Sequence, residues 1–392
     1  MFSLLPDETS KWKEYCRAQH ALLVKGGASE TELVAKGNLQ ATAKGDKAGL
    51  TTTARTRSES GNQEKGAAKA VVDKKIEKVP NSKIIKVKNT LYSLNNLAKV
   101  TRKYSTAKII GITGSVGKTT LKNLIGFALT HYGKVHQSPY SYNNKVGVPL
   151  SLSNLKENTE YGVFEIGMDK KGEIDRLSKI VQPEIGVITN ISGAHFKNFK
   201  TLKDIAKAKS EIINNISRGG KIVLNKDDKF FSFFYNMSKK KGLKITSFSL
   251  RKKADISLLK ITKIKNHYKL KIATKDKNFY FYAAHSTNNF ISNTLACIAV
   301  LYELNLNLKK IEKKLLSFSI PPGRGDIKIV KKFKKKFKFI DESYNANPLS
   351  MLSAIRNMNY YKKKKNSRKI VFLGDMLELG DKSRKFHKEL VS

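Results

Sequence analysis

The sequence predicts an α/β protein with a central parallel sheet. From about residue 108 onward, short apolar runs alternate with stretches of helical period, which is typical of buried parallel strands joined by crossover helices. One such run, AKIIGI at 107–112, leads directly into the glycine-rich TGSVGKTT at 113–120. The chain has 392 residues, which is enough for two or three domains. Together these observations predict a central P-loop domain flanked by further domains.

The N-terminal region has the weakest pattern. Residues 1–36 show no clear period, and residues 49–62 are polar and small, so that stretch is expected to be loop or disordered. Residues 67–72 and 83–87 are strand-like, and 91–102 has the spacing of a helix. We therefore expect an N-terminal domain over 1–105 that is partly disordered.

The central domain is expected over 106–318. Buried parallel strands are predicted at the four apolar runs, and three alternating strands and an apolar helix follow them. The predicted runs are 109–112, 163–166, 185–189 and 221–224, then 256–261, 268–272 and 279–282, with the helix at 287–304.

A natural break, PPGRG at 321–325, separates a C-terminal α/β unit over 319–392. Within this unit, 337–341 and 369–374 are predicted to be strands, each ending in a polar loop.

Charge and cysteine content limit the function classes. Seventy-six basic against 32 acidic residues give a net charge of +44, which would attract nucleic acid, anionic membranes or small anions. Most of the cations are lysines, which lack the fork that lets arginine read bases, and no nucleic-acid module is recognisable. We interpret the charge as a composition bias on solvated faces and expect no nucleic-acid partner.

The cysteine content and the lack of a recognisable signal peptide or membrane span predict a soluble protein. Only Cys16 and Cys297 are present, which favours a reducing compartment. No signal peptide is recognisable, and the longest apolar run, 295–302, is far shorter than the ~20 residues that span a bilayer. We expect a cytoplasmic monomer without membrane insertion.

The stretch TGSVGKTT has the pattern of a phosphate-binding loop. A strand that ends in a glycine-rich turn before a helix presents backbone N–H groups to an anion. The lysine would contact the terminal phosphates of ATP, and the threonine hydroxyl after it would face Mg²⁺. The expected nucleotide-binding residues are Gly114, Ser115, Val116, Gly117, Lys118, Thr119 and Thr120.

Three further positions fit a metal site beside the phosphates. Glu165 lies in the apolar strand of FEIGM, where a bare carboxylate is costly unless it is paired or on a metal. His195 ends TNISGAH at 189–195. Taken alone, each could be structural, and Lys209 on a helix would ordinarily face solvent. With Thr119, however, the Glu and His can surround Mg²⁺ for phosphoryl transfer.

In this order, the motifs resemble the Mur ligases, the cytoplasmic ATP-dependent enzymes of peptidoglycan precursor synthesis. The resemblance covers roughly 106–387 and is greatest to the branch that adds D-alanyl-D-alanine. The segments that carry it are TGSVGKTT (113–120), SYNNKVGVPL (141–150), FEIGM (164–168), TNISGAH (189–195), AKAKSEI (206–212), LNKDD (224–228), PPGRGD (321–326), DESYNANPLSM (341–351) and LGDMLELG (373–380).

The resemblance implies a three-domain architecture: an N-terminal UDP-substrate domain, the P-loop ATPase domain and a Rossmann-like C-terminal domain. It implies that ATP activates the carboxylate of a UDP-N-acetylmuramoyl-tripeptide as an acyl phosphate, which the amine of D-alanyl-D-alanine attacks. The N-terminal motif departs from the family, with no Arg beside Ser29 and Gln40 in place of an aromatic residue. The C-terminal domain is expected to be incomplete, since the chain ends at Ser392.

The resemblance also implies residue roles. Lys118 would hold the phosphates, Glu165 and His195 would complete two metal sites with Thr119, and Lys209 corresponds to a carbamylated lysine that helps to hold Mg²⁺. Arg324 would reach the γ-phosphate, so the catalytic set is Lys118, Lys209, His195 and Arg324. The other implied contacts are Asn289 and Asn293 on the adenine side, Asp341 at the ribose, and Asn143, Asn144, Tyr344, Asn345 and Asn347 at the substrates.

Two other readings stay open. One is a degraded or chimeric relative that binds ATP without ligating, which would explain the atypical N-terminal motif. The other is a basic nucleic-acid-binding P-loop protein, for which the sequence offers only the charge. A sister ligase that adds a different amino acid is disfavoured by SYNANP at 343–348.

Overall fold

The computed structural model describes residues 70–73, 81, 84–193, 198–265, 267–332, 335–360 and 368–390. The chain divides into two units, Met1–Leu94 and Asn95–Ser392. In the first unit, strands β1 (Ala70–Val72) and β2 (Ile84–Lys86) pair in parallel. Helix α3 (Thr90–Tyr104) follows β2, so the predicted helix at 91–102 is confirmed. The expectations for 1–36 and 49–62 fall outside the described residues.

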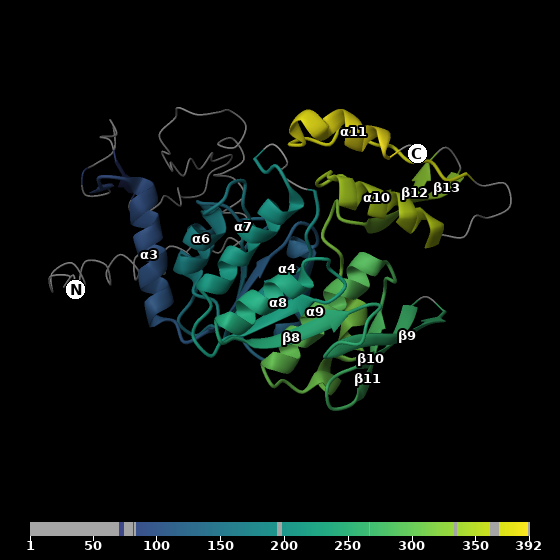
Figure 1. The fold of residues 1–392 in the computed structure, drawn as a ribbon, viewed down its shortest axis with the longest axis horizontal. Coiled ribbons are helices and arrows are strands. Elements are labelled where there is room, and N and C mark those ends of the chain that lie inside the picture. The colour runs from purple at the N-terminus through teal and green to yellow at the C-terminus, as the bar shows by residue number, and fades with distance from the viewer. Residues whose placement is uncertain are drawn as a thin grey trace, which may run out of the picture. The chain divides into compact units, whose positions relative to one another are not determined.

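A mostly parallel sheet forms the centre of the second unit (Figure 1). Within the described residues it has nine strands in the order β11-β10-β9-β8-β7-β6-β3-β5-β4. Neighbours from β4 to β9 run parallel, whereas β9, β10 and β11 are antiparallel. The strands are β3 (Lys108–Thr113), β4 (Val135–Gln137), β5 (Tyr161–Glu165), β6 (Ile185–Ile188), β7 (Lys221–Asn225), β8 (Lys244–Ser249), β9 (Ile256–Ile264), β10 (His267–Ala273) and β11 (Asn278–Ala283).

Successive side chains of a central strand point to opposite faces of the sheet, so each such strand contributes to two separate hydrophobic cores. Ile110 and Ile112 of β3 belong to one hydrophobic cluster, and Ile109 between them belongs to the other. The first cluster includes α4 and α9, and the second includes α5 to α8. Burial on both faces explains why these strands read as continuous apolar runs. The helices are α4 (Lys118–Leu129), α5 (Gly147–Ser153), α6 (Glu173–Val181), α7 (Leu202–Asn214), α8 (Phe231–Lys240) and α9 (Asn288–Glu303).

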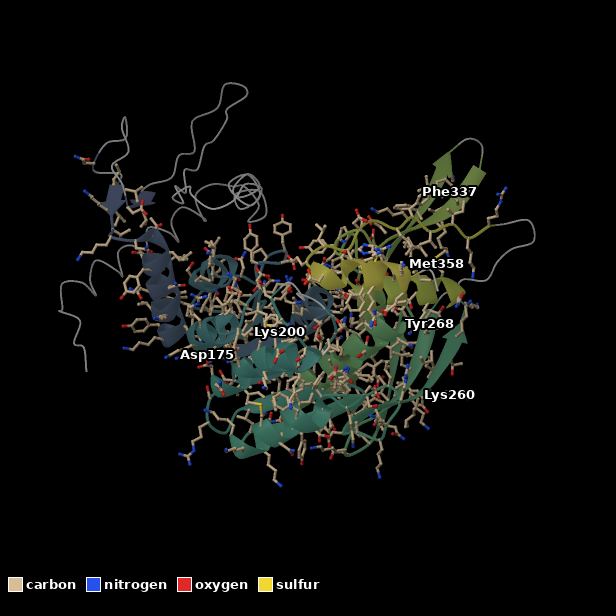
Figure 2. All side chains as sticks on the ribbon, turned by 45° about the horizontal axis from the view of Figure 1, so that its top comes forward. Asp175, Lys200, Lys260, Tyr268, Phe337 and Met358 are labelled. Atoms are coloured by element: carbon tan, nitrogen blue, oxygen red, sulfur yellow. The ribbon has the colours of Figure 1, made fainter. Side chains whose placement is uncertain are left out.

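The antiparallel strands extend the same sheet. The sequence predicted three alternating strands after the parallel ones, and β9 to β11 confirm them. Strand β11 alternates between exposed and buried residues, since only one of its faces packs on α9 and the short helices η2 (Leu308–Ile311) and η3 (Lys314–Ser317). In Figure 2, Lys260 projects from the outer part of β9. Exposed lysines of this kind fit the interpretation of the charge as a bias of solvated faces.

The C-terminal residues begin with a hairpin, β12 (Asp326–Lys332) and β13 (Lys335–Asp341), followed by α10 (Pro348–Asn357) and η4 (Met358–Tyr360). Helices η5 (Gly380–Lys382) and α11 (Ser383–Lys388) lie near the end. The strand predicted at 369–374 is wrong, because these residues form no strand and Phe372 is 90% exposed. An apolar run becomes a strand only when a neighbouring strand accepts its N–H and C=O groups.

None of the described helices is long and apolar enough to cross a membrane.

A buried carboxylate ties the last turn of α9 to the sheet. Glu303 is fully buried, and its Oε1 accepts a hydrogen bond from Thr246 Oγ1 on β8 at 2.5 Å. Its Oε2 lies 3.4 Å from Lys221 Nζ and 3.1 Å from Lys244 Nζ. Burial alone would raise the pKa of Glu303, but the bonds from Thr246 and Lys244 outweigh it and hold this pKa below the ordinary 4.5.

We expect Glu303→Gln to lower the free energy of unfolding by about 2 kcal/mol at neutral pH. Breaking a buried pair costs ~3–5 kcal/mol, and the water around the partly exposed lysines screens some of that. Because the folded pKa is the lower one, the difference is complete above pH 4.5 and is lost as the pH falls through the folded pKa. Urea unfolding as a function of pH measures it. The exposed Glu157→Gln is the control, and equal effects of both substitutions would contradict the assignment.

Candidate active site

The glycine-rich turn between β3 and α4 has the conformation of a phosphate-binding loop. Gly114 has φ 145° and Gly117 has φ 86°, both in the region that favours glycine. A Cβ at Gly114 would lie 1.9 Å from Thr189 Oγ1, so the loop also packs tightly on the end of β6. No side chain caps the N-terminus of α4. Its first-turn N–H groups lack acceptors within the helix, and they suit an anion.

The residues after β6 hold this loop in place. The N–H groups of Ser115 and Val116 donate to Asn190, to its backbone oxygen at 2.9 Å and to its Oδ1 at 3.0 Å. Thr189 Oγ1 donates to the carbonyl of Val116 at 2.8 Å, and Ser192 N–H donates to Ser115 Oγ at 3.0 Å. Two of the predicted nucleotide contacts therefore already bond within the protein, and the anion-binding capacity lies at the start of α4.

Glu165 ends β5 directly beside the loop. Its partner in the parallel register is Ile112 of β3, which brings the carboxylate next to the first turn of α4. The side chain is 1% exposed. Oε2 accepts from Thr119 Oγ1 at 2.7 Å, and Oε1 accepts from Asn143 Nδ2 at 2.7 Å. These bonds satisfy the buried carboxylate and bring together three residues that the sequence predicted for one site.

Two lysines at the site have lowered pKa values. Burial lowers the pKa of Lys118, an effect that Glu165 opposes and Arg324 adds to. Lys209 on α7 is 1% exposed. Burial lowers its pKa well below the ordinary value, Lys118 lowers it further, and Glu165 opposes both. Lys209 therefore does not lie on a solvated helix face.

Two C-terminal side chains reach the same place. Arg324 Nη2 donates to Ser141 Oγ at 3.0 Å, and Tyr344 OH donates to the same oxygen at 2.6 Å. The guanidinium carbon of Arg324 lies 3.7 Å from the centre of the Tyr344 ring, a close cation–π contact. Ser141 Oγ is also 3.3 Å from Thr119 Oγ1. Three side chains that are far apart in the sequence, Thr119, Arg324 and Tyr344, thus meet around the hydroxyl of Ser141.

The remaining predicted residues lie in various places. Asn293 Nδ2 donates to the Gly117 carbonyl at 3.3 Å, and Asn289 is exposed one turn earlier on α9. Asn345 is exposed. His195 lies outside the described residues.

Three predicted residues have local contacts that their motifs did not indicate. Asn144 Oδ1 accepts from the N–H groups of Val146 and Gly147 at the start of α5. Asn347 caps α10. Asp341 accepts from the N–H and hydroxyl of Ser343, and these bonds lower its pKa.

Sequence reasoning missed three residues that organise the site: Ser141, Asn190 and Lys122. Ser141 begins the SYNN motif, and Asn190 lies inside TNISGAH, so their motifs were found but not their individual roles. Lys122 lies four residues after Lys118 on the same helix and donates to the carbonyls of Ser138 and Tyr140. The spacing of four could have placed it on the same helix face.

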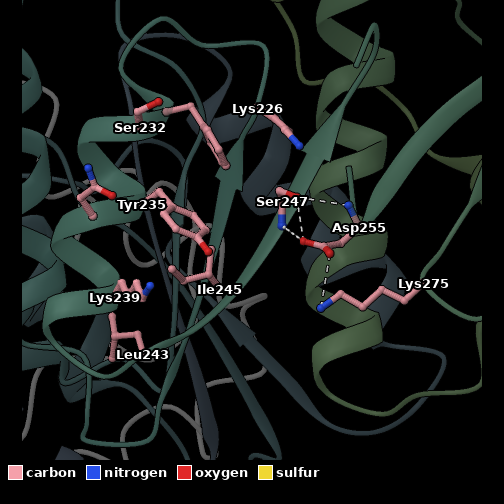
Figure 3. A pocket seen from close by; sticks show the side chains of 11 residues that line it. Lys226, Ser232, Tyr235, Lys239, Leu243, Ile245, Ser247, Asp255 and Lys275 are labelled. Atoms are coloured by element: carbon pink, nitrogen blue, oxygen red, sulfur yellow. Dashed lines mark hydrogen bonds and ion pairs between the residues drawn. The ribbon is translucent and has the colours of Figure 1, made fainter. Parts of the chain in front are cut away.

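A separate cavity of about 810 Å³ lies against α8 and contains none of the predicted site residues (Figure 3). On its wall, Asp255 accepts hydrogen bonds from Ser247 and pairs with Lys275 at 3.4 Å. These contacts occupy the carboxylate within the protein.

The chemistry of the site suits a polyanion with a terminal phosphate. Three basic side chains, Lys118, Lys209 and Arg324, lie near a single carboxylate, Glu165, and a helix N-terminus adds its partial positive charge. Among the described residues, no group of three His, Cys, Asp or Glu side chains could hold a metal by itself. An Mg²⁺ ion that is bound partly by phosphate oxygens needs only one or two protein carboxylates.

Comparison with known proteins agrees with this geometry. Residues 112–301 match the Mur ligase middle domain. The chain is 32% identical over 329 residues to the UDP-N-acetylmuramoyl-tripeptide–D-alanyl-D-alanine ligase of Rickettsia prowazekii, covering 84% of this chain and 72% of that protein. It is 35% identical over 338 residues to the ligase of that name from Buchnera aphidicola, covering 83% and 69%.

Solved structures give the same result. MurF from Acinetobacter baumannii superposes with a TM-score of 0.74 at 30% identity, covering 83% of this chain and 69% of that one. MurF ligase from Thermotoga maritima in complex with ADP gives 0.70 at 25% identity, covering 83% and 73%. The resemblance inferred from the motifs is confirmed, and the chain belongs to the Mur ligase family.

Proposed function

We propose that this chain is an ATP-dependent ligase that joins D-alanyl-D-alanine to UDP-N-acetylmuramoyl-tripeptide. Relatives that carry this activity in their names align over more than four fifths of the chain. One structural observation carries the proposal. The phosphate loop, the loop with the sequence SYNN at 141–144 (the SYNN loop) and the Arg324–Tyr344 pair meet at Ser141 Oγ. A nucleotide phosphate and a second substrate would have to meet at this place.

The proposed division of labour follows the chain. Residues 106–318 bind ATP, 1–105 serve the UDP-linked substrate, and 319–392 form the Rossmann-like part that brings Arg324 to the γ-phosphate. An ADP complex of the related Thermotoga maritima ligase supports the nucleotide assignment. Asn289 and Asn293 on α9 would flank the adenine, with Asp341 near the ribose.

The reaction has two steps. A terminal carboxylate oxygen of the tripeptide attacks the γ-phosphorus, the bond to the β,γ-bridging oxygen breaks, and ADP leaves. The amine of D-alanyl-D-alanine then attacks the acyl carbon, loses a proton and expels phosphate to leave an amide. Lys118, Arg324 and the start of α4 stabilise the charge that builds on the transferred group. Tyr344, Asn345 and the SYNN loop orient the acceptor and the amine.

Magnesium fits this site. Thr119 Oγ1 and Glu165 Oε2, 2.7 Å apart, offer the hard oxygen ligands that Mg²⁺ prefers, and His195 would add to them. When bound, the ion supplies neutralisation of phosphate charge.

Lys209 gains a role from its low pKa. A neutral amine reacts with carbon dioxide to form a carbamate, with a new N–C bond and release of one proton. The carbamate is an anion, so it would attract the ammonium of Lys118 and add an oxygen ligand. Burial, to which the charge of Lys118 adds, lowers the pKa of the amine well below its ordinary value and so favours the neutral form that this reaction requires.

The decisive test is phosphate release from MgATP with UDP-N-acetylmuramoyl-tripeptide, with and without D-alanyl-D-alanine. We expect release to require both substrates and the amide product to appear in equal amount. ATP binding without product would establish the alternative, a relative that binds nucleotide and does not ligate.

We expect Lys118→Ala to lower kcat by about 10²–10³-fold, because it removes a cation from the transferring phosphoryl group. Steady-state phosphate release measures the effect. Lys179→Ala, an exposed lysine on α6, is the matched control. Similar rates for both variants would contradict the role of Lys118.

We expect Lys209→Ala to lose at least about 10²-fold in kcat, as is typical when one group that stabilises the transition-state charge is removed. Small carboxylic acids such as acetate should partly restore activity by replacing the carbamate oxygens. Isotopically labelled bicarbonate should give a carbamate carbon signal in the wild type and not in the variant. A wild type without that signal would rule out carbamylation.

A further inference from the structure

Lys122 is a buried cation close to the site, yet it contacts none of the groups that would react. It lies one helical turn after Lys118 on α4, and only 1% of its surface is exposed. Burying an ammonium group without partners is very costly, so its retention requires specific contacts.

Those contacts are two backbone carbonyls of one loop. Nζ donates to the oxygens of Ser138 and Tyr140, each at 2.5 Å. Both oxygens are neutral, so the ammonium remains a buried charge, and burial lowers its pKa to about 8 while Glu165 opposes the shift. The cation is therefore fastened to the backbone rather than neutralised by a bonded carboxylate.

The loop that contains Ser138 and Tyr140 has a strained backbone that these hydrogen bonds stabilise. Tyr140 has φ 42°, a left-handed conformation that is strained for a non-glycine residue. It is also 53% exposed, so its own side chain contributes little packing. The bond from Lys122 to the Tyr140 carbonyl holds the turn at this strained residue.

The next residues of the loop form the site. Ser141 contacts Thr119, Arg324 and Tyr344 through its hydroxyl, and Asn143 donates to Glu165. The position of these contacts follows from the position of the Tyr140 carbonyl immediately before them. A shift of about 1 Å at such a place can cost ~10²-fold in rate.

We propose that Lys122 is a positioning residue that fastens loop 138–144 to the phosphate-binding helix and so sets Ser141 and Asn143 against Thr119 and Glu165. One helix thereby carries the phosphate site at its first turn and the substrate loop at its second. The kinetic consequence rests on the proposed ligase function: the loss of Lys122 impairs use of the tripeptide carboxylate and leaves nucleotide affinity intact.

The test compares Lys122→Met with the exposed control Lys179→Met by hydrogen exchange. Amides of the loop donate within it or to β5, from Ser138 to Val163 and from Tyr142 to Pro139. In Lys122→Met we expect their exchange to rise about tenfold, the effect of losing one net hydrogen bond, with α9 and β3 unchanged. Exchange that rises equally in all segments, or in none, would show that Lys122 is only a core residue.

Two binding and rate measurements complete the test. We expect the Kd for ADP to stay within about twofold and kcat/KM for UDP-N-acetylmuramoyl-tripeptide to fall about 10²-fold. An equal loss in both quantities overturns the proposal. A wild type that does not ligate would refute the proposed function, while the exchange result would still decide the role of Lys122.

A second variant covers the case in which Lys122→Met does not fold. Lys122→Arg keeps the charge, but its larger guanidinium displaces the two carbonyls. In this variant we expect a smaller increase in hydrogen exchange, still confined to the loop, and an unchanged ADP affinity. Wild-type exchange in the loop combined with a fall in kcat/KM would contradict positioning through the loop.

Discussion

The carboxylate of Glu165, buried at the end of a central strand, is the interaction on which the site depends. The parallel pairing of β3 with β5 fixes it beside the phosphate loop. Its two oxygens bond one residue of that loop and one of the SYNN loop, so a single group aligns two segments that the chain separates by more than 20 residues. A carboxylate at this depth is stable only with both oxygens satisfied, which makes the alignment obligatory.

Around this one anion the protein places an excess of buried or half-buried basic side chains, namely Lys118, Lys209 and Arg324. Burial lowers the pKa of both lysines. Such an imbalance weakens the folded state in the absence of a ligand. It becomes favourable when a polyphosphate enters, which is the usual relation between strained electrostatics and function. The many lysines on the surface, in contrast, are not arranged around a buried carboxylate in this way.

Much of the fold could be predicted because it depends on local pattern. Two-sided burial produces continuous apolar runs, so β3, β5, β6 and β7 were all recognisable. The phosphate loop is set by glycines that adopt left-handed conformations, and glycine marks these in the sequence. The segment at 369–374 has an equally apolar pattern and forms no strand, since pairing depends on a neighbour that a local pattern does not specify.

The site was predictable at the level of motifs and less so at the level of individual side chains. Glu165 and Thr119 were placed together correctly, and the resemblance gave Lys209 a role that helix periodicity alone would have denied. Lys122 and Ser141 escaped notice because their importance arises from contacts across 16 to 203 positions in sequence. Asn144 and Asn347 show the converse, since asparagine in a motif can also accept hydrogen bonds from the backbone at the start of a helix.

The hydroxyl of Ser141 has only one hydrogen. Arg324 can only donate, and Tyr344 also donates to this oxygen, so both lone pairs of Ser141 are used. Thr119 gives its own hydrogen to Glu165, and the hydrogen of Ser141 must therefore point to Thr119. The result is a hydrogen-bond chain with a fixed direction, from the guanidinium to the carboxylate. Its polarity is imposed by the two charges at its ends. Any group that replaces Glu165 as the acceptor of Thr119 changes the strength of every hydrogen bond along the chain. The bond from Arg324 to Ser141 therefore changes although Arg324 does not contact that group.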